Sequence, residues 1–504
     1  MRPFALLALA LVSASVAGAQ RPKDPLAGLD RYVEKALADW GVPGAAVAIV
    51  RGDSVILAKG YGVRRLGESA PVDAETIFAI GSNSKAFTTA ALALLVDEGK
   101  LAWDDRVITH LPWFQLRDPW ITRQLDIRDL VSHRSGVARH DALWYATRRS
   151  TENVVRQLRF ADTELPFRSG WLYNNNLYLT AGLVIERLGG ASWDDFVASR
   201  LLRPLGMTRA STTVRGLEGT PNVAAPHMTL DGTLQPVAFR NIDNAGPAGS
   251  INASARDMAR WLQFQIDSGR VGGRRLLAAG QFAEMWRARA IIHDPLFRSL
   301  FAPSELVEYG LGWFLFLHRD RKVVLHGGNI DGMSALVSFI PDERIGVVVL
   351  TNLNQTFAHA GVTRWIFDRL LGAPEEDWNV KTLALFERAR AADAGRPSWK
   401  SGRVEGTKPT LALSAYAGAY TDSLYGGATV RERSGALELE LDPGHVARLS
   451  HWHYDTFRAV FEDRTMNEGA NLVTFRFDAR GRVSSVEVPG FAEYSRAREG
   501  RAGS

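Results

Sequence analysis

The sequence predicts an α/β (α+β) protein: an antiparallel sheet flanked by helices, with an inserted helical lobe, followed by a small all-β barrel-like domain. Two β-hairpin patterns lie far apart, at 45–59 and 334–351. The region between them has helical periodicity broken by Gly and Pro loops, and the region after about 411 alternates apolar and polar residues. Hairpins at both ends of a helical middle are expected to share one sheet, with a cleft between the sheet and the helical lobe.

The elements of the first part are expected in a clear order. A helix over Leu29–Trp40 is predicted because its apolar residues recur at helical spacing. The first hairpin has Gly52 and Asp53 at its joint, and the second turns at 341–344, where Pro and Asp are typical turn residues. A helix over 357–371 ends this part of the chain. We therefore predict a main domain at 20–372.

The C-terminal part is predicted to be separate. Residues 373–410 are interpreted as a linker that contains one helix at 380–392 between two prolines. From 411 to 504 the sequence consists of short alternating runs, such as 437–441 and 473–477, divided by Gly-containing turns. This pattern predicts a β barrel or half-barrel.

Composition excludes several function classes. The chain has 504 residues and a formal net charge of +5, with basic and acidic residues intermixed. Because no Lys/Arg run stands out, nucleic acid is not an expected partner. The chain contains no cysteine, which excludes disulfides, thiolate catalysis and Cys-ligated zinc. No cofactor is expected.

The N-terminus predicts export. Arg2 precedes an apolar stretch at 4–16, and Ala-Gly-Ala at 17–19 fits a cleavage site. Residues 1–19 are therefore predicted to be a signal peptide, with a mature periplasmic or secreted chain that starts near Gln20 and has no stable membrane anchor. An uncleaved anchor is the alternative, but the apolar stretch is short for a membrane span.

The first chemical motif is Ser82-x-x-Lys85, which opens a predicted helix that ends near Gly99. Residues three apart share one helix face, so both side chains should point the same way at the helix N-terminus. A lysine whose pKa is lowered by burial can take the proton of a serine hydroxyl, and helix N–H groups favour an oxyanion. A surface Ser-x-x-Lys is the common alternative, but the rest of this helix is apolar.

Two further motifs carry chemistry. Tyr173-Asn174-Asn175 lies in a polar loop before an apolar helix at 177–188; a phenol near a lysine can shuttle protons, although a helix cap alone would also explain it. His326-Gly327-Gly328 follows an apolar strand, and a strand that ends in Gly-Gly lets backbone approach a ligand closely.

The remaining histidines are weaker candidates. His359 matches the same loose pattern as His326 but lies in a helical context, so it is discarded. His451 and His453 could start a metal site, but no third ligand is apparent and no metal is predicted. His133 and His140 are interpreted as structural or loop residues.

In order and separation, the motifs at 82–85, 173–175 and 326–328 resemble those of the serine β-lactamase and penicillin-binding-protein family, in its class C β-lactamase, D,D-peptidase and esterase branch. The stretches at 125–136 and 204–207 resemble that branch too. The resemblance covers about residues 25 to 372. The tail resembles a β domain of unknown function that is often appended to such hydrolases.

The resemblance implies a role for each catalytic residue. Ser82 would be acylated, while Lys85 and Tyr173 would exchange the protons. Asn175 would hold the substrate amide, and the backbone N–H groups of Ser82 and Asn329 would form the oxyanion hole.

One residue departs from the family pattern. His326 stands where many class C β-lactamases have a lysine, which favours the esterase, D-aminopeptidase or D,D-peptidase-like members. We therefore expect a serine hydrolase that cleaves ester, amide or D-amino-acid peptide bonds of a small molecule or peptide, including one derived from peptidoglycan. The alternatives are a true class C-like β-lactamase and a non-catalytic peptidoglycan-binding or scaffold protein. The oligomeric state is left open.

Overall fold

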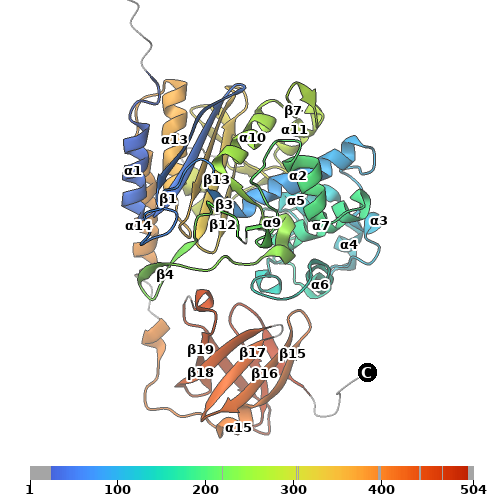
Figure 1. Cartoon of the computed structure of the whole chain (residues 1–504). Coiled ribbons are helices and arrows are strands. Elements are labelled where there is room, and N and C mark those ends of the chain that lie inside the picture. Colours follow the sequence, from blue (N-terminus) through green and yellow to red (C-terminus); the bar gives the residue numbers. More distant parts are fainter. Residues whose placement is uncertain are drawn as a thin grey trace, which may run out of the picture.

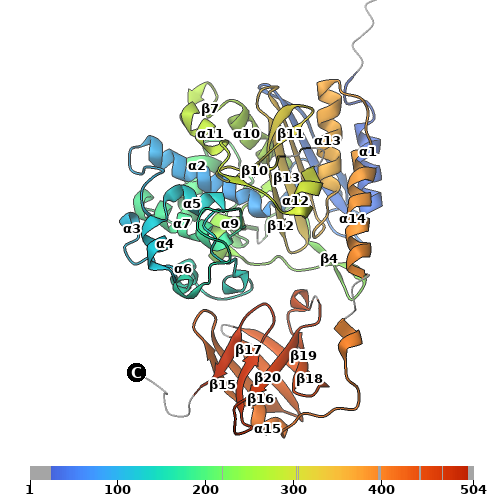
Figure 2. The ribbon, with the colours of Figure 1, turned by 180° about the vertical axis from the view of Figure 1, so that it is seen from behind.

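The computed structural model describes residues 24–217, 219–301, 304, 306–394, 399–441, 444–467 and 469–497. The predicted signal peptide lies outside these residues. In Figure 1 a large α/β domain stands above a smaller barrel, and the same two bodies are seen from behind in Figure 2. Among the described residues, no helix combines the length and apolar character needed to cross a membrane.

One antiparallel sheet of eight strands forms the centre of the large domain, in the order β2-β1-β14-β13-β12-β11-β10-β9. The strands are β1 (Gly44–Arg51), β2 (Ser54–Gly62), β9 (Ala290–Ile291), β10 (Glu308–Tyr309), β11 (Phe314–His318), β12 (Arg321–Ile330), β13 (Met333–Ile340) and β14 (Ile345–Thr351). β1 pairs directly with β14, with Ala45 opposite Thr351. The two predicted hairpins therefore do share one sheet.

Helices cover both faces of this sheet, as Figures 1 and 2 show. On one face lie α1 (Leu29–Trp40), α13 (Ala358–Leu371) and α14 (Trp378–Ala394), and on the other lie α2 (Ser84–Asp97) and α10 (Ala255–Ile266). Because side chains alternate along a strand, β1 serves both cores. Val47 packs in the cluster of α1 and α13, whereas its neighbour Ala48 packs in the cluster of α2 and α10.

The helical lobe is inserted between β3 (Ile77–Ala79) and the second half of the sheet. Its α-helices are α3 (Val107–His110), α4 (Pro119–Gln124), α5 (Ile127–Ser132), α6 (Thr151–Gln157), α7 (Asn175–Gly189), α8 (Trp193–Val197) and α9 (Gly246–Gly249). The remaining elements of the large domain are β4 (His227–Leu230), β5 (Thr233–Pro236), β6 (Asn252–Ser254), β7 (Arg270–Val271), β8 (Arg274–Arg275), α11 (Ala279–Met285) and α12 (Pro295–Phe301).

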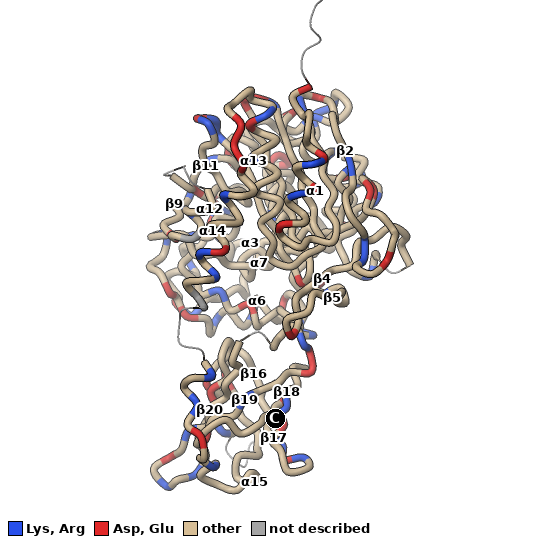
Figure 3. The backbone as a smooth tube through the Cα atoms, turned by 90° about the vertical axis from the view of Figure 1, so that its left-hand side faces the viewer, with Lys and Arg blue, Asp and Glu red and all other residues tan. Residues whose placement is uncertain are grey.

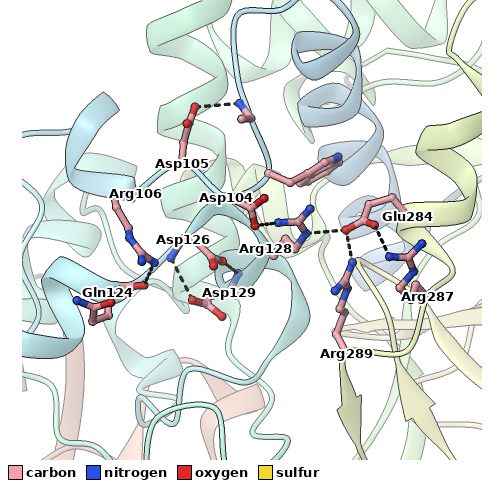
Figure 4. Close-up of polar contacts among 12 residues, drawn as sticks. Asp104, Asp105, Arg106, Gln124, Asp126, Arg128, Asp129, Glu284, Arg287 and Arg289 are labelled. Atoms are coloured by element: carbon pink, nitrogen blue, oxygen red, sulfur yellow. Dashed lines mark hydrogen bonds and ion pairs between the residues drawn. The ribbon is translucent and has the colours of Figure 1, made fainter.

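A charged network fastens this lobe around α5 (Figure 4). Asp126 and Asp129 form a capping box, in which each carboxylate accepts the backbone N–H of the other residue. Arg128 lies between the exposed carboxylate of Asp104 and Glu284 of α11, 2.6 Å from the latter. The network joins the lobe to the α10–α11 region.

The C-terminal body is a closed eight-stranded barrel in which each strand pairs with the next and the last pairs with the first. Its strands are β15 (Gly418–Asp422), β16 (Gly426–Arg433), β17 (Ala436–Leu441), β18 (His445–His453), β19 (Thr456–Phe461), β20 (Leu472–Phe477), β21 (Val483–Glu487) and β22 (Glu493–Arg496), preceded by α15 (Leu413–Tyr416). Leu437, Leu439 and Leu441 all point into the buried core, which confirms the predicted period of two.

The barrel contacts the large domain through polar groups. Arg240 pairs with Asp463 at 2.7 Å, Arg464 pairs with Asp231 at 2.6 Å, and the Tyr425 hydroxyl lies 2.9 Å from Nδ1 of His140. Basic and acidic residues are interspersed over both bodies in Figure 3, as the composition suggests.

Candidate active site

Ser82 lies at the N-terminal end of the buried helix α2. The sequence predicts that the Ser82-x-x-Lys85 motif opens an α-helix, but the structure has a 3₁₀ turn at Gly81–Asn83, and α2 begins at Ser84. Gly81 has a φ of +53°, which a residue with a side chain rarely adopts. This tight turn still leaves Ser82 and Lys85 on one face, with 3.0 Å between Ser82 Oγ and Lys85 Nζ.

Lys85 is fully buried and contacts neutral acceptors. Its Nζ lies 2.8 Å from the carbonyl oxygen of Ala248 in α9, and 4.9 and 5.2 Å from the ring centres of Tyr173 and Tyr178. Burial lowers the pKa of Lys85 well below its usual value, and the nearby cation of Arg139 lowers it further. A larger fraction of Lys85 is therefore the neutral amine, which can accept the serine proton.

Tyr173 completes this group from the loop that precedes α7. Its phenol interacts with Ser82, and burial raises the pKa of the phenol above its usual value despite that contact. The phenol is therefore protonated at neutral pH. The ring of His133 packs against the Tyr173 ring in a tilted arrangement, with 4.2 Å between ring centres, and its Nδ1 accepts the backbone N–H of Asn174 at 3.0 Å. His133 therefore has the structural part that the sequence suggests, and it holds the tyrosine loop.

Asn175 is the first residue of α7 and is almost completely buried. Its Nδ2 donates to Oδ1 of Asp141 at 2.9 Å. The preceding residue, Asn174, caps α7 by accepting the N–H of Leu177 at 3.0 Å. The helix-cap interpretation therefore holds for Asn174, while a substrate-binding role of Asn175 stays a prediction.

β12 brings the third motif to Ser82. The prediction that the strand ends at Gly-Gly is wrong: β12 continues to Ile330, with Gly327 and Gly328 paired to Leu336 and Ala335 of β13. Gly328 is needed for a different reason. A Cβ on Gly328 would lie 1.8 Å from the carbonyl oxygen of Ile80, so only glycine lets this strand pass so close to the serine turn.

His326 is a residue of β12, and its side chain is buried, with 1% of the residue exposed. Its ring contacts the carbonyl oxygen of Gly327 through Nδ1 at 2.6 Å and the hydroxyl of Tyr309 through Nε2 at 3.0 Å. Burial, with a smaller part from Lys85, lowers the pKa of His326 to about 3. The neutral ring thus donates from Nδ1 and accepts at Nε2, and the side chain supports the strand.

The last predicted residue, Asn329, lies beside the serine turn. Asn329 is exposed, and its backbone nitrogen is 2.7 Å from the position that a Cβ on Gly81 would take. The backbone N–H of Asn329 therefore lies beside the turn that carries Ser82. Two N–H groups in this arrangement can stabilise an oxyanion.

Five residues around the site were not singled out for catalysis by the sequence: Arg139, Asp141, Tyr178, Tyr309 and, as the support of the tyrosine loop, His133. All five lie outside the three motifs. His133 belongs to the 125–136 stretch, which resembles the family, but no local pattern marks the other four.

The two histidines that were considered for a metal site, His451 and His453, have other partners. His451 contacts the carbonyl oxygen of Tyr454 at 3.0 Å, and His453 accepts the N–H of Val404 at 3.2 Å. Within the described ranges, no group of three or more His, Asp or Glu side chains is placed to hold a metal ion.

The β-lactamase family model matches residues 29–371, which is more than half of the chain. The chain belongs to the β-lactamase family. A second model, described as a domain of unknown function, matches residues 402–500 of this β-lactamase-family protein and includes the whole barrel. Unguisins hydrolase ungD of Aspergillus violaceofuscus is 30% identical over 457 residues, which cover 83% of this chain and 77% of that protein.

Solved structures of the family share the fold. The octameric penicillin-binding protein homologue from Pyrococcus abyssi superposes with a TM-score of 0.62 at 22% identity, and covers 93% of this chain and 99% of its own. The D-amino acid amidase from Ochrobactrum anthropi superposes with a TM-score of 0.55 at 21% identity, over 72% of this chain and 99% of its own. These two structures show the shared fold, while the family match and the 30% identical unguisins hydrolase support a serine hydrolase.

Proposed function

We propose that this protein hydrolyses an ester, amide or D-amino-acid peptide bond through an acyl-enzyme on Ser82. The observation that carries the proposal is the 3.0 Å contact between Ser82 Oγ and the fully buried Nζ of Lys85. A buried amine with a lowered pKa next to a hydroxyl is the arrangement that an activated serine requires. The family match and the hydrolases among the relatives support the same class of reaction.

The acylation step follows from the positions of three side chains. Lys85 accepts the proton of Ser82 as Oγ bonds to the substrate carbonyl carbon, whose oxygen becomes negative beside the N–H groups of Ser82 and Asn329. Tyr173, which is protonated because burial raises its pKa, gives its proton to the leaving oxygen or nitrogen as that bond breaks. The proton on Lys85 then restores the phenol.

Deacylation uses the same groups in reverse. A water molecule loses a proton to the Tyr173–Lys85 pair as its oxygen attacks the acyl carbon. The bond to Ser82 Oγ breaks, and the serine takes up that proton. The products are a carboxylic acid and the regenerated site, so the protons balance without a cofactor.

The true β-lactamase remains the second candidate, and His326 argues against it. At the place where a lysine would offer a cation to a substrate carboxylate, this chain has a buried, neutral imidazole. The 30% identical relative is named a hydrolase of unguisins rather than a β-lactamase, which supports the first candidate. A non-catalytic scaffold is disfavoured because burying Lys85 is costly and serves no binding purpose.

We further propose that the mature protein acts outside the cytoplasm, in the periplasm or after secretion. The proposal rests on the sequence of residues 1–19, which has the basic start, apolar stretch and small-residue cleavage site of a signal peptide. N-terminal sequencing of the protein from its native source tests it: a chain that still begins at residue 1 would contradict cleavage.

The first experiment is intact-mass spectrometry after incubation with a fluorophosphonate, with Ser82→Ala as the matched control. One adduct on the wild type and none on the variant supports Ser82 as nucleophile. No adduct on either protein contradicts the proposed reaction, and an adduct on both means that another serine reacts. Turnover of a chromogenic cephalosporin as fast as that of D-alanine p-nitroanilide would favour the β-lactamase instead.

A further inference from the structure

Residues 137–141, which we call the 137–141 segment, are fastened to the loop of the catalytic tyrosine by a row of asparagines. Asn174 donates through Nδ2 to the carbonyl oxygens of Val137 and Ala138, both at 3.0 Å. Asn176 donates through Nδ2 to the carbonyl oxygen of Arg139 at 2.7 Å. The segment therefore lies directly against the residues that follow Tyr173.

Asp141, at the end of this segment, determines the orientation of the Asn175 amide. Its Oδ1 accepts hydrogen bonds from Nδ2 of Asn175 and from Nε1 of Trp144, both at 2.9 Å, and its other oxygen pairs with Arg139. A carboxylate only accepts hydrogen bonds, so the amide nitrogen of Asn175 must face it. That nitrogen carries two hydrogens, so one hydrogen and the carbonyl oxygen are left for other partners.

His140 connects this arrangement to the barrel. Its backbone is left-handed, with φ of +42° and ψ of +49°, a conformation that is unfavourable for a residue with a side chain. The short helix that begins with Asp141 starts directly after it. The barrel residue Tyr425, which is 4% exposed, holds the His140 ring through the contact between its hydroxyl and Nδ1 at 2.9 Å.

We propose that Asp141 is a positioning residue for Asn175 and that the C-terminal barrel keeps it in place through Tyr425. The barrel thereby takes part in recognising an amide in the acyl half of the substrate. This inference rests on the proposed function, because it assigns a partner to a residue of the Ser82 site. Asp141 acts through Asn175, and its effect falls on substrates that present an amide to that side chain.

If the contact between the two bodies were only structural, losing it would lower kcat/KM for all substrates by the same factor. Two esters with the same leaving group separate the possibilities: the p-nitrophenyl ester of N-acetyl-D-alanine carries an acyl-side amide, and p-nitrophenyl propionate does not. The measured quantity is the ratio of kcat/KM for the amide-bearing ester to that for the propionate. The variants, all in the full chain, are Asp141→Ala, Asp141→Asn and Tyr425→Phe.

We expect the ratio to fall at least tenfold in Asp141→Ala, because a misplacement of about 1 Å costs up to about a hundredfold. Tyr425→Phe should lower it about fivefold, the effect of one hydrogen bond. Asp141→Asn should stay within about threefold of wild type, because its Oδ1 can still accept from Asn175 and Trp144. Asp342→Ala in an exposed turn and Tyr454→Phe on the exposed barrel surface are matched controls and should leave the ratio unchanged.

An unchanged ratio in Asp141→Ala overturns the inference, and so does an equal loss for both esters. A wild type that is phosphonylated on Ser82 but does not prefer the amide-bearing ester overturns it as well, while the proposed hydrolase stands. A wild type without any Ser82 adduct overturns the proposed function itself. The adduct measurement therefore distinguishes the two failures.

Discussion

Replacing Gly328 by alanine tests the close approach of β12 to the serine turn. The added Cβ would lie 1.8 Å from the carbonyl oxygen of Ile80 and 2.8 Å from Nδ2 of Asn83. Real Cβ atoms essentially never come closer than 3.0 Å to such atoms, so strand and turn must separate by more than about 1 Å. A displacement of that size between the N–H groups of Ser82 and Asn329 should slow acylation about a hundredfold.

The neighbouring glycine gives a matched control. A Cβ on Gly327 would meet its nearest neighbours at 3.8 Å, which is ordinary contact, so Gly327→Ala should react within about twofold of wild type. The assay is the second-order rate of phosphonylation by a fluorophosphonate, followed by intact mass, with Tm measured in parallel to show that each variant is folded. If Gly328→Ala reacts as fast as Gly327→Ala, the strand does not form part of the oxyanion hole.

Three further outcomes follow from the structure. Lys85→Met should slow phosphonylation about 10²- to 10⁴-fold without lowering Tm, because the general base is lost while the site stays filled; a normal rate would exclude Lys85 as the base. Arg139 and Lys85 lie 5.1 and 4.9 Å from the centre of the Tyr173 ring, so the two cations repel each other. Removing the charge in Arg139→Gln should therefore raise the pKa of Lys85 and shift the acidic limb of the phosphonylation rate to higher pH, whereas Arg139→Lys, which keeps the charge, should not; an unchanged profile in Arg139→Gln would contradict this. Asp129→Ala should lower the free energy of unfolding by about 1.5–3 kcal/mol in urea titrations, because Arg134 and Arg168 lose one of their two buried carboxylates and the Asp126 N–H loses its cap. Asp104→Ala, at an exposed carboxylate, should cost under about 1 kcal/mol, and equal losses would contradict this account.

The fold could be predicted where turn residues and the spacing of apolar residues mark the elements. The hairpin of β1 and β2 and that of β13 and β14 have turn residues and apolar runs, and their pairing through β1 and β14 follows from burying both. The last two strands on one side of the sheet, β10 and the edge strand β9, have two residues each and leave no periodic signal. The 3₁₀ turn before α2 was also missed, because it depends on the close approach of Asn329 to Gly81.

In the site, too, contacts between residues close in the sequence could be predicted, whereas contacts between distant residues could not. Ser82 and Lys85 are one helical turn apart, so their contact could be derived from spacing alone. The contact of His140 with Tyr425 joins residues 285 positions apart, and that of Asn175 with Asp141 joins residues 34 apart across a loop. No periodicity encodes such pairs, since they depend on how a loop and a separate domain meet.

The surroundings of Lys85 fit the proposed transfer of protons among Ser82, Lys85 and Tyr173. A carboxylate in direct contact would keep the lysine charged, but its Nζ instead contacts Ser82 Oγ, the Ala248 carbonyl oxygen and two aromatic rings. Two imidazoles also lie nearby, and the pKa values of His133 and His326 are lowered first by burial and then by the charge of Lys85. A lowered pKa makes each imidazole a weak base, so under the proposed mechanism we expect the serine proton to move to Lys85 rather than to a histidine.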